Sequence, residues 1–305
     1  MNKIARLKKW NEYRSWPAGF YHMIIDSFEK GQLFNNDAEF AAGMNTVALG
    51  QYIHKIKILI FELMSNHAHF MIWATGSAAV DFFIYQKKRI NARLVKDGFP
   101  PLPDDLGFML VPIDPSDPFQ LQNGIIYIAR NPHKADSMIT PSGYLWGSSY
   151  LLFSNISKII QKKQVKDYSV DFMRNVLCSK TRLPDNYFFN DNLGMILPES
   201  YVLNQKTEQI LKSAWNYCNN LVKNMDAYIK ISEKIGAKIN INDRELDTII
   251  YTICKNKYNV KSYLELSIDD RCRLGVRLFK DYHIDVKRIC RKIGIEHYIM
   301  AELIK

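Results

Sequence analysis

The 305-residue chain has little that marks a secreted or membrane protein. It has only five cysteines, an odd number that contains no C-x-x-C pair and does not fit a disulfide framework. No apolar run approaches the ~20 residues that a membrane span needs, and no apolar segment typical of a secretory signal follows the basic N-terminus. Low-complexity tracts and internal repeats are absent too. We therefore expect a soluble, cytoplasmic protein with reduced thiols and no membrane association.

Lysine and arginine are present in excess. The 41 basic residues exceed the 31 acidic ones and give a formal charge of +10. The excess is +2 over residues 1–154, +5 over 155–182 and +5 over 230–305, while 183–229 carries −2. Such an excess favours a polyanionic partner such as nucleic acid, although blocks of this kind are as often solvated faces.

The first 150 residues alternate between strand-like and helix-like patterns. We expect strands at 20–28, 55–64, 67–73 and 108–113, and helices at 40–52, 80–96 and 121–131, the last of them limited by Pro132. Only Ser65 and Asn66 separate the second and third strands, which predicts a hairpin. The fold class is therefore α+β, and a ferredoxin-like antiparallel sheet with helices on one face is its simplest arrangement.

Beyond residue 150 the pattern becomes helical. We expect three regions: a domain at 1–150, a basic and loop-rich helical connector at 151–240, and an all-helical domain at 241–305. Near the C-terminus, helices are expected from Ser267 to about Tyr282, at 286–293 and at 296–304. Gly294 between the last two is typical of a helix-turn-helix, in which a small turn residue lets one helix cross the other.

A pair of histidines stands on the third strand. Side chains two apart on a strand point to the same face, so His67 and His69 share one face while Ala68 and Phe70 point to the other. Two adjacent imidazoles form half of a divalent-metal site. The alternative is a hydrogen-bonded histidine pair with a structural role.

A tyrosine stands on the expected helix 121–131. Residues four apart share a helix face, so Tyr127 and Asn131 project together. A phenol is a poor nucleophile at neutral pH, but a phosphate polarised by a metal is a better electrophile for it. The alternative is a packing tyrosine on an amphipathic helix.

Five segments in chain order resemble the IS200-like single-tyrosine transposases of the HUH endonuclease superfamily, near the REP-associated tyrosine transposases. The segments lie within residues 16–150 and are Tyr21-His22, Leu33-Phe34, Leu63 to Phe70, Tyr127 to Ala135, and Tyr144 to Tyr150.

The resemblance implies an HUH endonuclease fold that cleaves and rejoins single-stranded DNA. His67 and His69 would hold Mg²⁺ or Mn²⁺ against the scissile phosphate, with Asn131 as the third metal ligand. Tyr127 would attack the phosphate and form a 5′-phosphotyrosine link, leaving a free 3′-OH. His22 would lie near the site or serve the first strand structurally. The family also implies a homodimer.

The C-terminal pattern resembles the trihelical DNA-binding domains of replication initiators and transposases. Basic side chains would contact the phosphates of hairpin or duplex DNA, and the last helix would lie near the groove if it reads bases. The expected DNA-binding residues are Lys287, Arg288, Arg291, Lys292, His297 and Tyr298. The alternative is a small helical bundle that mediates oligomerisation.

The sequence thus predicts a DNA transposase that is cytoplasmic and associates with the nucleoid through DNA. Two other functions stay open. One is a non-catalytic DNA-binding regulator derived from such an enzyme, and the other is a rolling-circle replication nuclease that shares the metal and tyrosine chemistry.

Overall fold

A computed structural model describes residues 3–26, 32–104, 106–135, 140–223, 243–282 and 284–304. The chain divides into two compact units, Met1–Lys223 (unit 1) and Asn224–Lys305 (unit 2). Each unit is described by itself.

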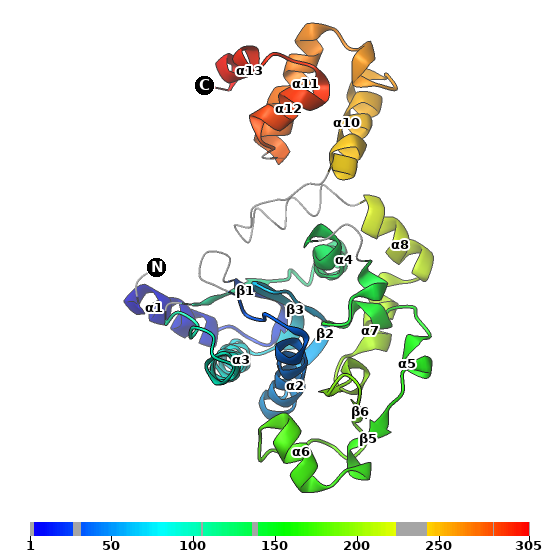
Figure 1. The fold of residues 1–305 in the computed structure, drawn as a ribbon. Coiled ribbons are helices and arrows are strands. Elements are labelled where there is room, and N and C mark those ends of the chain that lie inside the picture. Colours follow the sequence, from blue (N-terminus) through cyan, green and yellow to red (C-terminus); the bar gives the residue numbers. More distant parts are fainter. Residues whose placement is uncertain are drawn as a thin grey trace. The chain divides into compact units, whose positions relative to one another are not determined.

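Unit 1 is built around a four-stranded antiparallel sheet. Its strands are β1 (Gly19–Asp26), β2 (Lys57–Leu63), β3 (His67–Ala74) and β4 (Phe108–Pro112), in the order β2-β3-β1-β4. Helix α2 (Asp37–His54) connects β1 to β2, and α3 (Gly76–Lys96) connects β3 to β4 (Figure 1). The expected α+β class and the β2–β3 hairpin are confirmed. Asn36 caps α2 by accepting a hydrogen bond from Glu39 N, which fixes where that helix begins.

One face of the sheet packs on α2 and α3. Ala68, Phe70 and Ile72 of β3 are buried on this face, and the Phe70 ring meets Phe82 of α3 edge to face at 5.5 Å. The alternation of β3 places the two histidines on the opposite face, as the sequence predicts. Unlike the expected arrangement, that face also carries a helix, α4 (Pro118–Ala135), so the sheet has helices on both sides (Figure 1).

Helix α4 does not end before Pro132, so the expected helix limit was wrong. A proline inside a helix removes one backbone donor and leaves the carbonyl four residues earlier without its partner. Here the side chain of Asn131 supplies donors: its Nδ2 lies 3.4 Å from Ile128 O and 3.0 Å from Tyr127 O. The helix therefore continues to Ala135.

Helix α1 (Lys3–Arg14) lies along α3. Arg14 of α1 forms an ion pair with Asp81 of α3 at 2.6 Å, and the rings of Trp10 and Phe83 meet edge to face. These contacts pack α1 against α3.

The remainder of unit 1 consists of short elements. They are η1 (Pro141–Gly143), η2 (Ser149–Leu151), α5 (Ile156–Ile159), β5 (Lys163–Gln164), η3 (Val165–Asp167), α6 (Val170–Leu177), β6 (Phe188–Asn190), β7 (Met195–Ile196), η4 (Pro198–Ser200), α7 (Asn204–Leu211) and α8 (Ala214–Lys223). Strands β5, β6 and β7 form a second antiparallel sheet.

Residues 151–223 pack on the main sheet and its helices instead of forming a separate connector. Asn45, buried in α2, donates to Gly194 O at 2.9 Å and accepts from Ile196 N at 2.8 Å. Along the β2 edge, Leu203 N donates to Ile58 O, and Thr207 Oγ1 donates to Leu59 O, each at 2.8 Å. The expected boundary at residue 150 therefore does not separate compact units; residues 224–240 of the expected connector fall outside the described part.

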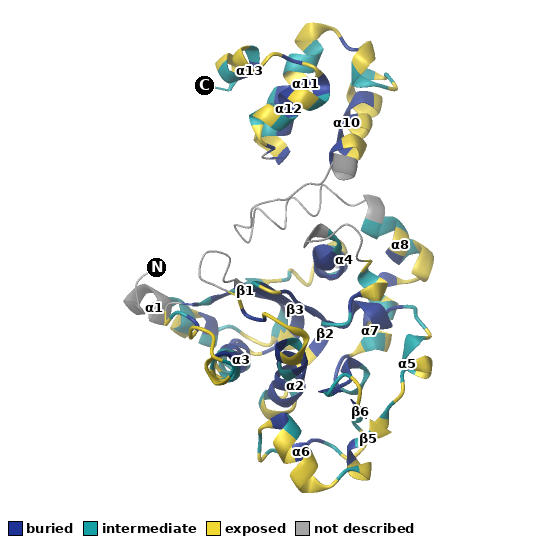
Figure 2. Cartoon of the chain, viewed as in Figure 1, coloured by how far each residue is buried: buried dark blue, intermediate teal, exposed yellow. Residues whose placement is uncertain are grey.

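Unit 2 is helical, as expected. It contains α10 (Asp243–Tyr258), η5 (Tyr263–Glu265), α11 (Ile268–Tyr282), α12 (Val286–Ile293) and α13 (His297–Leu303). Helices α11, α12 and α13 contact one another in all three pairs. Gly294 ends α12 in the left-handed conformation at φ +66°, which forms the expected turn before α13. The buried residues run along the inner faces of these helices, and the outer faces are exposed (Figure 2).

Candidate functional site

The two histidines of β3 are buried side by side on the α4 face of the sheet. Their ring centroids lie 5.1 Å apart. His67 is held through Nδ1, which lies 2.7 Å from Asn66 Oδ1. His69 is also held through Nδ1, here by His22 Nε2 of β1 at 3.1 Å. A metal ion would therefore be bound by the other ring nitrogen, Nε2, in both residues.

His22 is brought to this site by the strand register. On adjacent antiparallel strands, directly opposite residues share a face. Ile24 pairs with His69 and His22 pairs with Met71, so His22 lies on the α4 face and diagonal to His69. Burial lowers the pKa of His22 to about 3, so its imidazole is neutral at neutral pH.

Tyr127 of α4 completes a cluster of three rings. Its ring meets those of His22 and His69 edge to face, with both centroid distances 5.5 Å, and the two histidine centroids are 5.2 Å apart. Three elements distant in sequence thus contribute one side chain each to the cluster. Helix α4 lies close to the sheet at Gly124, where a Cβ would require the end of the Met71 side chain to shift. The structure therefore brings together Tyr127 and the His67–His69 pair.

Asn131 lies one turn beyond Tyr127 and is buried. Its amide nitrogen donates to carbonyls of its own helix, and its Oδ1 is the atom with the chemistry of a metal ligand. Among the residues that the structure describes, no group of three or more His, Cys, Asp or Glu side chains is arranged to hold a metal ion.

The ring cluster is covered. Tyr127 and His22 are each 2% exposed and His69 is 3% exposed. Helix α4 contacts strands β2 and β3 and also α7, α8 and η1. In this conformation almost none of the Tyr127 side chain is exposed to a DNA phosphate. Any chemistry at this tyrosine therefore requires α4 or its cover to move.

A buried glutamate beside the cluster was missed by the sequence analysis. Glu62 of β2 lies directly opposite His69 in the register and is fully buried. Its Oε1 accepts from Ser149 N at 3.1 Å, while Oε2 has no hydrogen-bond partner. Burial raises its pKa to about 8, and the hydrogen bonds from Ser149 oppose that shift. The available signal was one charged residue in the otherwise apolar run from Ile58 to Met64.

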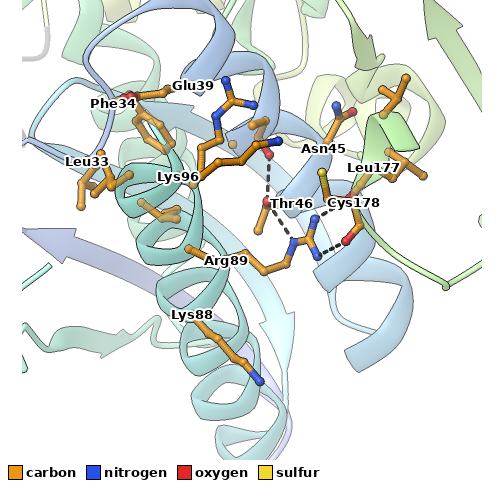
Figure 3. A pocket seen from close by; sticks show the side chains of 17 residues that line it. Leu33, Phe34, Glu39, Asn45, Thr46, Lys88, Arg89, Lys96, Leu177 and Cys178 are labelled. Atoms are coloured by element: carbon orange, nitrogen blue, oxygen red, sulfur yellow. Dashed lines mark hydrogen bonds between the residues drawn. The ribbon is translucent and has the colours of Figure 1, made fainter. Parts of the chain in front are cut away.

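A cavity of about 280 Å³ lies on the other side of the sheet, between α2, α3 and α6 (Figure 3). Arg89 of α3 crosses it and donates to Cys178 O at 3.2 Å and to Thr46 Oγ1 at 3.4 Å. Arg89 also donates to Leu177 O at 2.5 Å, so this guanidinium binds the C-terminal carbonyls of α6. The cavity contains none of the expected site residues.

In unit 2 the expected DNA-binding residues lie on α12 and α13. Lys287 and Arg291 are exposed, as are His297 and Tyr298 at the start of α13; Arg288 is half-buried. Lys292 differs because its Nζ forms an ion pair with Asp247 of α10 at 2.7 Å. That pairing reduces the charge which Lys292 offers to a phosphate.

We compared the chain with protein-family models, curated proteins and solved structures, and none of them matches it. None of the described helices is both long enough and apolar enough to span a membrane.

Proposed function

We propose that the chain is a metal-dependent tyrosine DNA endonuclease and strand transferase, a transposase, that acts on single-stranded DNA. The observation that carries the proposal is the packing of Tyr127 against His69, next to His67. The element order β1-α2-β2-β3-α3-β4 with strand order β2-β3-β1-β4 is that of a ferredoxin-like fold, which supports an HUH endonuclease domain in unit 1.

The donor set fits a divalent ion in its chemistry. Histidines that bind metals are commonly held by a hydrogen bond through their other nitrogen, and both His67 and His69 are held in this way. Two imidazoles with an amide oxygen from Asn131 suit Mn²⁺ better than Mg²⁺, which prefers oxygen ligands only. When bound, the ion would neutralise charge on the phosphate and assist the leaving oxygen.

The protein supplies the nucleophile. In the proposed reaction Tyr127 Oη attacks phosphorus and loses its proton, the bond from phosphorus to the 3′-oxygen breaks, and that oxygen leaves as a 3′-OH. The DNA is then held as a 5′-phosphotyrosine, so the energy of the phosphodiester is kept for joining to a second end. Rejoining distinguishes a transposase from a rolling-circle nuclease. Unit 2 would bind a hairpin or duplex next to the cleaved strand, and a homodimer would present two sites.

Covalent trapping tests the proposal. The full chain is incubated with a labelled pool of single-stranded, hairpin-containing oligonucleotides in Mn²⁺, and denaturing gels report a protein–DNA adduct. We expect an adduct for the wild type, none for Tyr127→Phe, and none for His67→Ala or in EDTA. Tyr21→Phe is the matched control, because Tyr21 is an equally buried tyrosine whose ring stacks on Trp16.

An adduct that persists in Tyr127→Phe would show that another residue is the nucleophile. Undiminished cleavage in EDTA would remove the role of the metal.

A second function, a non-catalytic DNA-binding regulator, is favoured by the burial of Tyr127 together with the exposed basic and aromatic side chains of α12 and α13. In that case the full chain binds specific duplex DNA but forms no adduct with any strand of the pool. Tyr127→Phe then leaves DNA binding unchanged.

A further inference from the structure

His22 is a polar group that contacts the proposed site, but the proposed reaction gives it no role. It is almost fully buried in the central strand β1. Burying a polar side chain costs free energy unless it has a hydrogen-bond partner, and an apolar side chain at this position would need none. Instead its Nε2 lies 3.1 Å from Nδ1 of His69.

The direction of that hydrogen bond is linked to the tautomer that His69 adopts. Two imidazole nitrogens at this distance need one hydrogen and one lone pair between them. If Nδ1 of His69 carries the hydrogen, its Nε2 presents a lone pair and can bind a cation. If His22 Nε2 carries the hydrogen instead, His69 is protonated on Nε2 and is no longer a metal ligand there.

We propose that His22 is a positioning residue that accepts the hydrogen bond from Nδ1 of His69, so that Nε2 of His69 is directed to a divalent metal ion. The inference rests on the proposed function. The Asn66 side chain plays the equivalent part for His67, since its Oδ1 can only accept from Nδ1. Both histidines of the pair would then be held in one tautomer by a neighbouring acceptor.

The position of His22 against Tyr127 adds a second effect. The centroid of its ring lies 5.5 Å from that of the Tyr127 ring, and the His69 ring lies at the same distance from Tyr127. His22 therefore contacts both the expected metal ligand His69 and the proposed nucleophile Tyr127. A phenylalanine at this position keeps the ring but removes the acceptor.

The first test uses the metal-free full chain. Two-dimensional ¹H–¹⁵N spectra of the histidine side chains distinguish the two neutral tautomers. We expect His69 as the Nδ1–H form in the wild type and a loss of this preference in His22→Phe. Finding wild-type His69 as the Nε2–H form overturns the inference, whatever the protein does to DNA.

The second test measures Mn²⁺ affinity by calorimetry. Removing a hydrogen-bond partner of a metal-binding histidine typically lowers the affinity for the metal ion by about 10–100-fold. We expect a loss of Mn²⁺ affinity of that order in His22→Phe. We expect partial recovery in His22→Gln, which restores an acceptor. Thermal unfolding of both variants controls for packing. Unchanged affinity in His22→Phe overturns the inference and leaves the proposed function intact. Wild-type Mn²⁺ binding that is insensitive to His67→Ala contradicts the proposed function itself.

Discussion

The burial of Glu62 predicts that unit 1 loses stability as the pH rises. A carboxyl whose pKa is higher in the folded than in the unfolded chain keeps its proton on folding, so its folded-state advantage is greatest at low pH. The pKa is raised from 4.5 to about 8. The stabilising effect of the proton is therefore complete below pH 4.5 and is lost as the pH rises towards 8.

The magnitude follows from the size of the shift. One pKa unit corresponds to about 1.4 kcal/mol, so a shift from 4.5 to about 8 amounts to about 5 kcal/mol of unfolding free energy across this range. Glu62→Gln removes the titration and keeps an oxygen that can accept from Ser149 N. The variant has a buried amide with an unmatched donor, which costs about 1–3 kcal/mol at low pH.

The assay is urea unfolding at a series of pH values, followed by tyrosine and tryptophan fluorescence. We expect the wild type to be the more stable protein near pH 5 and the Glu62→Gln variant to be the more stable one near pH 8. Glu12→Gln is the control, because Glu12 is an exposed glutamate of α1 in the same unit, and this variant is expected to follow the wild type. A constant difference between wild type and Glu62→Gln from pH 5 to 8 would refute the reasoning.

Two further predictions concern the second sheet and unit 2. Asn45→Ala removes two hydrogen bonds from α2 to Gly194 and Ile196, so we expect a loss of about 2–4 kcal/mol in urea unfolding, and an unchanged midpoint would contradict the role of Asn45. Replacing Lys287 or Arg291 by alanine should each lower the salt dependence of duplex binding by about one counterion in fluorescence anisotropy. Lys292→Ala should change it less, because Lys292 is paired with Asp247; equal effects of the three variants would contradict this interpretation of the surface.

Local patterns predicted much of the sheet. The alternation in β3 correctly assigned Ala68 and Phe70 to the face opposite the histidines, because side-chain direction on a strand depends only on neighbouring positions. The start of α2 at Asn36 is local in the same way, since a cap is a contact within one turn. The helix ending at Gly294 depends likewise on one residue's backbone preference.

Contacts between distant segments were not predictable in the same way. The His22–His69 hydrogen bond joins residues 47 positions apart and depends on the register between β1 and β3. The continuation of α4 through Pro132 is accompanied by a contact from the Asn131 side chain to Ile128 O, the carbonyl that loses its backbone partner. The packing of residues 151–223 on β2 depends on polar contacts such as that of Thr207, which carry no sequence period.

The burial of Tyr127 sets the condition that a catalytic role must satisfy. Ile125, Ile126, Tyr127 and Ile128 are all buried in α4. At about 1.5–3 kcal/mol for each side chain, exposing them costs about 10 kcal/mol, comparable to the whole stability of a domain. Catalysis therefore requires either that the elements packed on α4 move away from Tyr127, or that α4 moves and is buried again elsewhere, for example against the same sheet face of a second copy. Hydrogen exchange tests this: if Tyr127 is the nucleophile, α4 amides should exchange faster when single-stranded DNA binds, whereas uniform protection with and without DNA would favour a structural ring cluster and the regulator.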